Sequence, residues 1–167
     1  LSDAPASGQE AQESAARVLD GGTLVCQTAP LSTIDPHLTR GYWERLACRC
    51  LFDSLTEYDF DQMTLVGKAA TSWEADEEAR RFTFHVREGV TFHNGSAVTS
   101  SCFAYAWGVL AASDEVDERL TACLSMVSGY EDVRAGKAGA RLDLECPDDY
   151  TLIVNLSRGF PDFAYMA

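Results

Sequence analysis

The sequence predicts an α+β fold in which an antiparallel sheet is covered by packed helices. Residues 81–86 alternate between apolar and polar side chains, which is the pattern of a strand with one buried face. Apolar residues recur instead at helical spacing in residues 41–55 and again after Thr99, as expected for helices that bury one stripe. Turn-forming residues separate these segments, which favours a single domain of alternating short elements.

The first predicted helix covers residues 41–55, and the strand of residues 81–86 lies in a hairpin after it. The helix is expected because its apolar side chains form one stripe: Tyr42, Trp43, Leu46, Ala47, Cys50, Leu51 and Leu55. The hairpin is expected because the polar residues 76–79 can turn in solvent and bring back a paired strand around Trp73.

Further helices are predicted in the second half of the chain. Residues 93–95, His-Asn-Gly, accept the positive backbone angles of a tight turn. The hydroxyl side chains of residues 99–101 can then cap a helix that continues to Ala112. Residues 117–126 form another predicted helix, and residues 130–135 form a short one that ends at a glycine.

A second hairpin is predicted near the end of the chain. Residues 141–146 and 150–156 both alternate between apolar and polar side chains. Between them lies Pro147-Asp148-Asp149, in which the proline suits a turn. Together with the first hairpin, these strands complete the expected antiparallel sheet.

Composition and charge restrict the possible partners. The 167 residues contain 13 Lys and Arg against 26 Asp and Glu, a formal net charge of −13, with 46% hydrophobic residues. This charge repels phosphate backbones, so no nucleic acid is expected as a partner. No apolar run approaches the roughly 20 residues that a membrane-spanning helix needs. We therefore expect a globular domain that does not span a membrane.

The first twenty residues have the composition of a flexible tether. They are rich in Ala, Ser, Gln and Glu, and such a segment buries too little apolar surface to offset the entropy of ordering. A short helix over residues 11–19 is the alternative interpretation.

The six cysteines indicate neither a disulfide pattern nor a metal site. Three disulfides among six cysteines can pair in fifteen ways, and the sequence leaves the pairing open; the simplest interpretation is that most are small apolar core residues. Cys48 and Cys50 are separated by one residue, so they point to different sides of a helix. No metal and no cofactor are therefore expected.

No catalytic arrangement is recognisable. The three histidines are dispersed, with His37 in a loop, His85 on the polar face of a strand and His93 in a turn. None has a serine or cysteine nucleophile at a recognisable position nearby. Paired carboxylates such as Asp148-Asp149 are more often solvated turn residues than acid and base partners. The sequence predicts a protein that is not an enzyme.

The stretch from Ser72 to Trp107 carries a dense series of residues in a familiar order: Ser72, Trp73, Glu74, Phe82, Thr83, Phe84, Val86, Arg87, Gly89, Val90, Phe92, His93, Asn94, Gly95 and Thr99. It resembles the pattern S-W-E, Y-T-F-x-L-R-x-G-V-x-F-H-D-G and T-A-x-D-V of the extracytoplasmic solute-binding proteins of ABC importers, in the peptide-, dipeptide- and nickel-binding cluster, family 5. Residues 23–39 also resemble the family's opening strand and L-D-P loop, and residues 148–167 resemble its strand that leads into a helix. One departure is Ser100-Ser101-Cys102, where the family usually has A-E-D.

The resemblance implies that the chain is an N-terminal fragment of a periplasmic-binding-protein class II-like fold. Residues 1–20 would be the tether, residues 21–50 the start of the first ligand-binding lobe, and residues 51–167 an inserted small α+β domain that returns toward this lobe. Most of the ligand cleft would then come from other parts of the full-length protein.

The function implied is capture of oligopeptides or dipeptides and their delivery to the permease subunits of an ABC transporter, so the expected partners are a peptide or similarly sized solute and these permease subunits. We expect a monomer in the periplasm or on the outer face of the cell membrane, and the resemblance implies a lipid anchor as the only link to the membrane. The alternatives are a nickel- or haem-binding member of the same family and an acidic protein-interaction module. A cysteine-dependent enzyme is a further hypothesis, which requires a thiol of low pKa near a base.

The resemblance also places five residues near the cleft. Thr28, Ala29 and Pro30 follow the opening strand, and Arg40 and Tyr42 stand at the start of the next helix. A tyrosine can stack on or hydrogen-bond a bound peptide, and an arginine can hold a carboxylate with two parallel hydrogen bonds. These five residues are the predicted substrate-binding residues.

Overall fold

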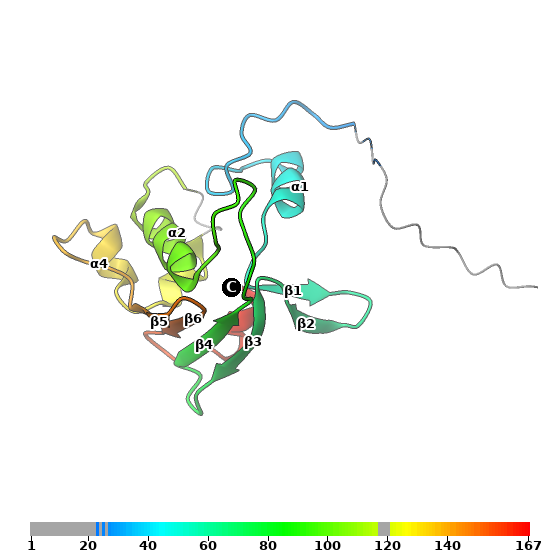
Figure 1. The fold of residues 1–167 in the computed structure, drawn as a ribbon. Coiled ribbons are helices and arrows are strands. Elements are labelled where there is room, and N and C mark those ends of the chain that lie inside the picture. Colours follow the sequence, from blue (N-terminus) through cyan, green and yellow to red (C-terminus); the bar gives the residue numbers. More distant parts are fainter. Residues whose placement is uncertain (1–22, 24, 26, 117–120) are drawn as a thin grey trace, which may run out of the picture.

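The computed structural model describes residues 23, 25, 27–116 and 121–167 (Figure 1). The predicted tether, residues 1–20, lies outside the described residues. The elements along the chain are α1 (Tyr42–Leu51), β1 (Thr56–Asp59), β2 (Thr64–Gly67), β3 (Ala70–Ala75), β4 (Arg81–Val86), α2 (Ser100–Ala112), the 3₁₀ helix η1 (Leu124–Met126), α4 (Tyr130–Arg134), β5 (Leu144–Asp148), β6 (Thr151–Asn155) and the 3₁₀ helix η2 (Pro161–Tyr165). Among the described residues, no helix is long and apolar enough to cross a membrane.

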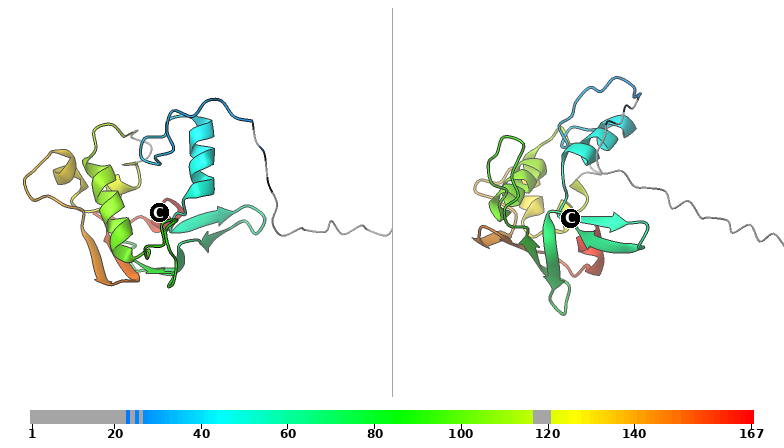
Figure 2. Two further views of the ribbon diagram at one scale, coloured as in Figure 1. Left: turned by 45° about the horizontal axis from the view of Figure 1, so that its top comes forward. Right: turned by 45° about the vertical axis from the view of Figure 1, so that its right-hand side comes forward.

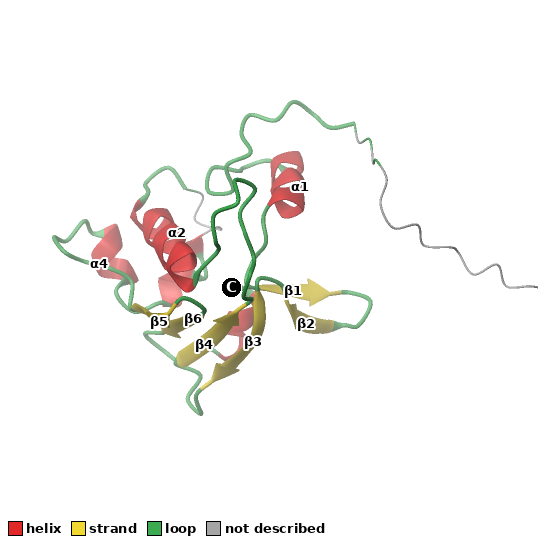
Figure 3. Cartoon of the chain, in the orientation of Figure 1, coloured by secondary structure: helices red, strands yellow, loops and turns green. Residues whose placement is uncertain are grey.

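The main sheet is antiparallel, as predicted, and has the strand order β3-β4-β6-β5. In its centre Phe82 of β4 lies opposite Val154 of β6, and Phe84 lies opposite Leu152. All four side chains are buried, because alternate residues of paired strands share one face of a sheet. Helix α2 packs against β5 and β6 on that face (Figure 3).

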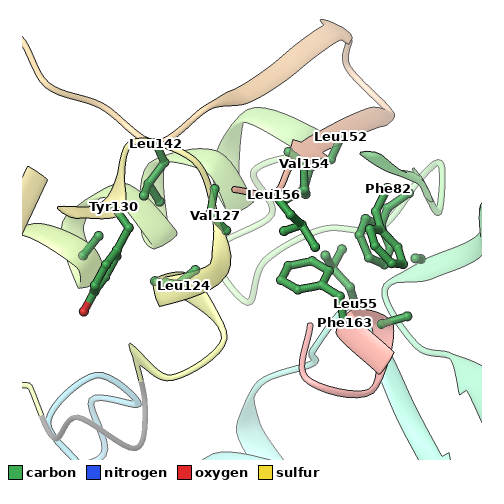
Figure 4. Close-up of a cluster of buried hydrophobic side chains, with 14 of the residues drawn as sticks. Leu55, Phe82, Leu124, Val127, Tyr130, Leu142, Leu152, Val154, Leu156 and Phe163 are labelled. Atoms are coloured by element: carbon green, nitrogen blue, oxygen red, sulfur yellow. The ribbon is translucent and has the colours of Figure 1, made fainter. Parts of the chain in front are cut away.

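The centre of the core is aromatic. The ring of Phe163 in η2 lies 5.2 Å from the ring of Phe82 and 6.5 Å from that of Phe84, measured between centroids. Trp107 of α2 meets Phe163 edge-on at 6.3 Å. Figure 4 shows Phe163 and Phe82 next to Leu55, with Leu124 and Val127 farther along the cluster. The η2 segment therefore closes the core between the sheet and α2.

A small second sheet was not predicted. Strands β1 and β2 form a hairpin of their own that projects from the main sheet (Figure 2). Its turn is held by the carboxylate of Asp59, which accepts hydrogen bonds from the N–H groups of Asp61 at 2.8 Å and Gln62 at 2.9 Å. Met63 takes up a left-handed conformation, with φ of 53°. The two strands have only four residues each, too few for a clear alternating pattern.

Helix α2 begins where the hydroxyl cluster predicted it, but its start is fixed differently. Thr99 is the N-cap residue and its side chain makes no capping hydrogen bond to the helix. Ser100 is buried instead, and its N–H and hydroxyl donate to the carbonyls of Asp149 and Asp148, each at 2.7 Å. The start of α2 is thus hydrogen-bonded to the β5–β6 turn.

The predicted bounds of the first helix and of strand β5 were wrong. The first helix ends at Leu51, not at residue 55, because the backbone becomes extended at Phe52. Strand β5 continues through Pro147 to Asp148, so the turn comes later than predicted. Pro147 is tolerated there because β5 is an edge strand with a register irregularity between Glu145 and Asp148.

Two further predictions concern the helix of residues 117–126 and the opening strand near residue 23. The predicted helix of residues 117–126 lies partly outside the described residues, and its described end is the 3₁₀ helix η1. The predicted opening strand near residue 23 is absent from the described residues 23, 25 and 27–31. A strand requires hydrogen bonds to a neighbour, and none of the described strands pairs with this segment.

Candidate functional site

The segment before α1 is organised by one buried carboxylate, that of Glu44, which is 8% exposed. Its Oε1 accepts hydrogen bonds from the N–H of Ser32 at 3.1 Å and from the Ser32 hydroxyl. Its Oε2 accepts from the N–H groups of Arg40 and Gly41, both at 2.9 Å. Glu44 therefore ties the loop of residues 32–41 to the first turn of its own helix.

These hydrogen bonds lower the pKa of Glu44 to about 2. The hydroxyl of Ser32 contributes most, followed by the backbone N–H groups of Gly41, Arg40 and Ser32, since donors to a carboxylate stabilise its charged form. Both oxygens are occupied, so Glu44 positions the loop and has little capacity left to bind a ligand. Sequence reasoning missed this role, although Glu at the third position of a helix is the known signal of a capping box.

Arg40 joins this loop to the connection after α2. Its guanidinium Nη2 donates to the backbone carbonyl of Glu115 at 3.1 Å. The two segments enclose an open pocket of about 550 Å³ whose lining residues are Ser32, Thr33, Leu38, Arg40, Gly41, Glu44 and Glu115. Arg40 carries five N–H donors, so most of its hydrogen-bonding capacity remains available at the rim of this pocket.

The structure places the five predicted substrate-binding residues in one exposed region of the chain. Arg40 lines the pocket. Tyr42 lies at the start of α1 with 66% of its surface exposed, and its ring meets that of Trp43 edge-on at 5.1 Å. Thr28, Ala29 and Pro30 are exposed and precede the anchored Ser32, but they do not line the pocket. No ligand contact is shown for these residues, which remain predicted binding residues.

A second open pocket, of about 700 Å³, lies at the end of the main sheet and shares no lining residue with the first. It is lined by Thr71, His85, Val86, Glu88, Asp148, Asp149, Tyr150 and Thr151. The carboxylate of Asp148 is engaged within the turn, where it accepts the N–H of Tyr150 at 2.9 Å and the hydroxyl of Thr151 at 3.0 Å. The N–H of Tyr150 is the main reason why the pKa of Asp148 is lowered.

The described cysteines are free thiols: Cys48, Cys50, Cys102, Cys123 and Cys146. Cys26 lies outside the described residues. Burial raises the pKa of Cys48 and of Cys123, which disfavours the reactive thiolate at both positions. Within the part of the chain that the structure describes, no three His, Cys, Asp or Glu side chains are grouped as metal ligands.

Comparison with known proteins identifies the family. The profile of the bacterial extracellular solute-binding proteins, family 5 (middle region), matches residues 64–167. The chain belongs to this family. It is 30% identical to the periplasmic oligopeptide-binding protein OppA of Salmonella typhimurium over 150 residues, which cover 88% of this chain and 27% of that protein.

Two solved structures confirm the predicted fold class. The murein tripeptide binding protein MppA of Escherichia coli superimposes with a TM-score of 0.70 at 25% identity, covering 78% of this chain and 26% of that one. Haemophilus influenzae OppA in complex with RPPGFSPFR superimposes with a TM-score of 0.67 at 32% identity, covering 77% of this chain and 25% of that one. The chain spans about a quarter of the length of these relatives.

Proposed function

We propose that this family member captures oligopeptides outside the cytoplasm and delivers them to the permease of an ABC transporter. The observation that supports this most strongly is the likeness to OppA, which extends over most of the chain and includes a relative solved with a peptide. In such a function no bond is made or broken, and the ligand is released unchanged after a conformational opening.

Within this function, residues 21–50 begin the first lobe, and residues 51–167 form the inserted small α+β domain and return toward this lobe. The distribution of the core supports this division. Every residue of the main buried cluster comes from Leu55 or later, and α1 contributes none. The contacts that reach from the α1 segment to the sheet domain include polar ones, such as Arg40 with the Glu115 carbonyl and Arg49 with Glu57 at 3.6 Å.

In this proposal the peptide lies along Thr28, Ala29 and Pro30, whose segment is held in place through Ser32 and Glu44. The N–H groups of the Arg40 guanidinium that do not donate to Glu115 form hydrogen bonds with a carbonyl or carboxylate of the peptide. Tyr42 offers its exposed ring to an apolar side chain of the ligand. The match covers only about a quarter of the length of the relatives, and the proposal assigns the opposite wall of the cleft to parts of the full-length protein outside residues 1–167.

The same proposal places the protein in the periplasm or on the outer face of the membrane, as a monomer held by a lipid anchor. The relatives OppA and MppA are periplasmic by name. The anchor is tested separately, by labelling cells with a radioactive fatty acid and asking whether the protein takes up the label.

A thermal-shift screen of the full-length protein tests the binding function. We expect peptides of several residues to raise the melting temperature, because a ligand that binds only the folded state stabilises it. Arg40→Ala should weaken peptide binding by about tenfold, the effect of roughly 1.4 kcal/mol. Arg158→Ala, which removes an exposed arginine outside the pocket, is the matched control and should bind normally. Indifference to every peptide would overturn the proposal.

A further inference from the structure

The connection between β4 and α2 is the tall dark green loop in Figure 1. It contains a tight turn at Asn94 and Gly95. The N–H of Phe92 donates to the carbonyl of Ser96 and the N–H of Gly95 donates to the carbonyl of Phe92, both at 2.8 Å. Gly95 has a φ of 84°, and a Cβ placed on it would meet nothing within 4 Å. The Asn94–Gly95 peptide is therefore exposed and sterically open on the glycine side.

The side chain of Asn94 is held by two donors from one neighbour. Its Oδ1 accepts the N–H of Ser96 at 3.0 Å and the Ser96 hydroxyl at 2.7 Å. Both donors withdraw electron density from the amide carbon Cγ. They also lie where negative charge develops when a nucleophile attacks that carbon, which is the arrangement that stabilises a tetrahedral intermediate.

We propose that Asn94 is a site of spontaneous deamidation in which the backbone nitrogen of Gly95 is the nucleophile and Ser96 the activating residue. The Gly95 nitrogen gives up its proton and bonds to Cγ of Asn94, while the Cγ–Nδ2 bond breaks and Nδ2 leaves as ammonia with that proton. Water then opens the cyclic imide. Attack at Cγ yields an ordinary aspartate at position 94, and attack at the main-chain carbonyl carbon yields isoaspartate.

The step that opposes this reaction is the release of the Gly95 N–H from the Phe92 carbonyl. The residues at the tip of the turn, 93–96, are all exposed, and hydrogen bonds at exposed loop tips open at little cost in free energy. Glycine adds no side chain that could block the approach of its nitrogen to Cγ. The turn therefore opens far more easily than the sheet behind it.

Asn155 is the other asparagine of the chain, and its surroundings oppose the same reaction. Its Nδ2 donates to Asp143 at 3.1 Å and to Glu145 at 2.9 Å, and its Oδ1 accepts from Arg81 at 3.1 Å. The next residue, Leu156, is buried, and its N–H donates to the carbonyl of Arg80 at 2.7 Å. Asn155 thus serves as an internal control within the same molecule.

The two products differ in their effect on the turn. An ordinary aspartate at position 94 keeps an oxygen that can accept both hydrogen bonds from Ser96, and the family pattern F-H-D-G carries an aspartate at this position. Isoaspartate inserts a methylene group into the backbone, which is incompatible with the two 2.8 Å hydrogen bonds of the turn. Conversion to aspartate therefore preserves the loop, whereas isoaspartate distorts it.

Incubation of the purified chain in mildly alkaline buffer, followed by digestion at acidic pH and peptide mass spectrometry, tests the proposal. We expect residue 94 to be converted to aspartate and isoaspartate at least about tenfold faster than residue 155, which corresponds to a barrier difference of about 1.4 kcal/mol. Ser96→Ala should slow conversion severalfold, and Asn94→Asp provides the mass standard.

A synthetic peptide of residues 90–98 gives the rate of deamidation at residue 94 in the absence of the folded structure. If the peptide converts while residue 94 of the folded chain keeps its amide, the proposal is overturned, because the turn then protects the site. An unchanged rate in Ser96→Ala overturns the activating role of Ser96.

Discussion

Phe163→Ala should lower the free energy of unfolding by about 4 kcal/mol, within the range for truncating a fully buried Phe. Phe163 is 0% exposed. Its ring lies 5.2 Å from that of Phe82 and 6.3 Å from that of Trp107, so truncation opens a cavity between the sheet and α2. Each lost aromatic pair also costs roughly 0.5–1.5 kcal/mol beyond the buried area.

Urea unfolding followed by tryptophan fluorescence measures this loss. With a slope of about 2 kcal/mol per molar urea, the midpoint should fall by about 2 M. The matched control is Tyr165→Ala in the same 3₁₀ helix, η2, because Tyr165 is 57% exposed and its truncation should cost less than about 1 kcal/mol. Equal losses for the two variants would refute the conclusion that η2 closes the core.

Two further changes test local features. The pKa of Glu44 is about 2 in the folded chain against an ordinary value of 4.5, so its stabilising effect is complete above about pH 4.5 and is lost as the pH falls toward 2. The Glu44→Gln variant should therefore lose less stability than the unchanged protein as the pH falls through that window. Acid titrations followed by circular dichroism measure this, and parallel curves of stability against pH for the two proteins would contradict the prediction. Gly129→Ala should cost at least about 3 kcal/mol in urea unfolding, since its φ is 87° and its Cβ would lie 2.2 Å from the Arg141 carbonyl oxygen. Gly136→Ala, with φ of 64° and open space around it, should cost only about 1–2 kcal/mol, and equal costs would contradict the steric argument.

The sequence predicts best where one residue pattern determines one element. Strand β4 has the predicted bounds, Arg81–Val86, because strict alternation matches a single buried face. Helix α2 begins within the predicted hydroxyl cluster. The end of α1 was predicted four residues too late because Leu55 fits the helical stripe, yet it packs in the core of the sheet domain.

Features that depend on distant contacts could not be predicted. The β1–β2 hairpin is stabilised by its own turn and by contact with η2, which lies far away in sequence. The pocket at Arg40 exists because the guanidinium meets the carbonyl of Glu115, 75 residues later. The position of Glu44 in the first turn of α1 could have indicated its capping bond to Gly41, but its hydrogen bonds to Ser32 and its burial depend on the fold of the preceding loop.

Calorimetric titration of the full-length protein with an oligopeptide tests the peptide-binding function most directly. The control is an equimolar mixture of the free amino acids that make up the same peptide. We predict saturable binding of one peptide per protein and no saturable heat from the mixture. Equal heats from the peptide and the mixture, or no heat from either, would contradict the proposed function.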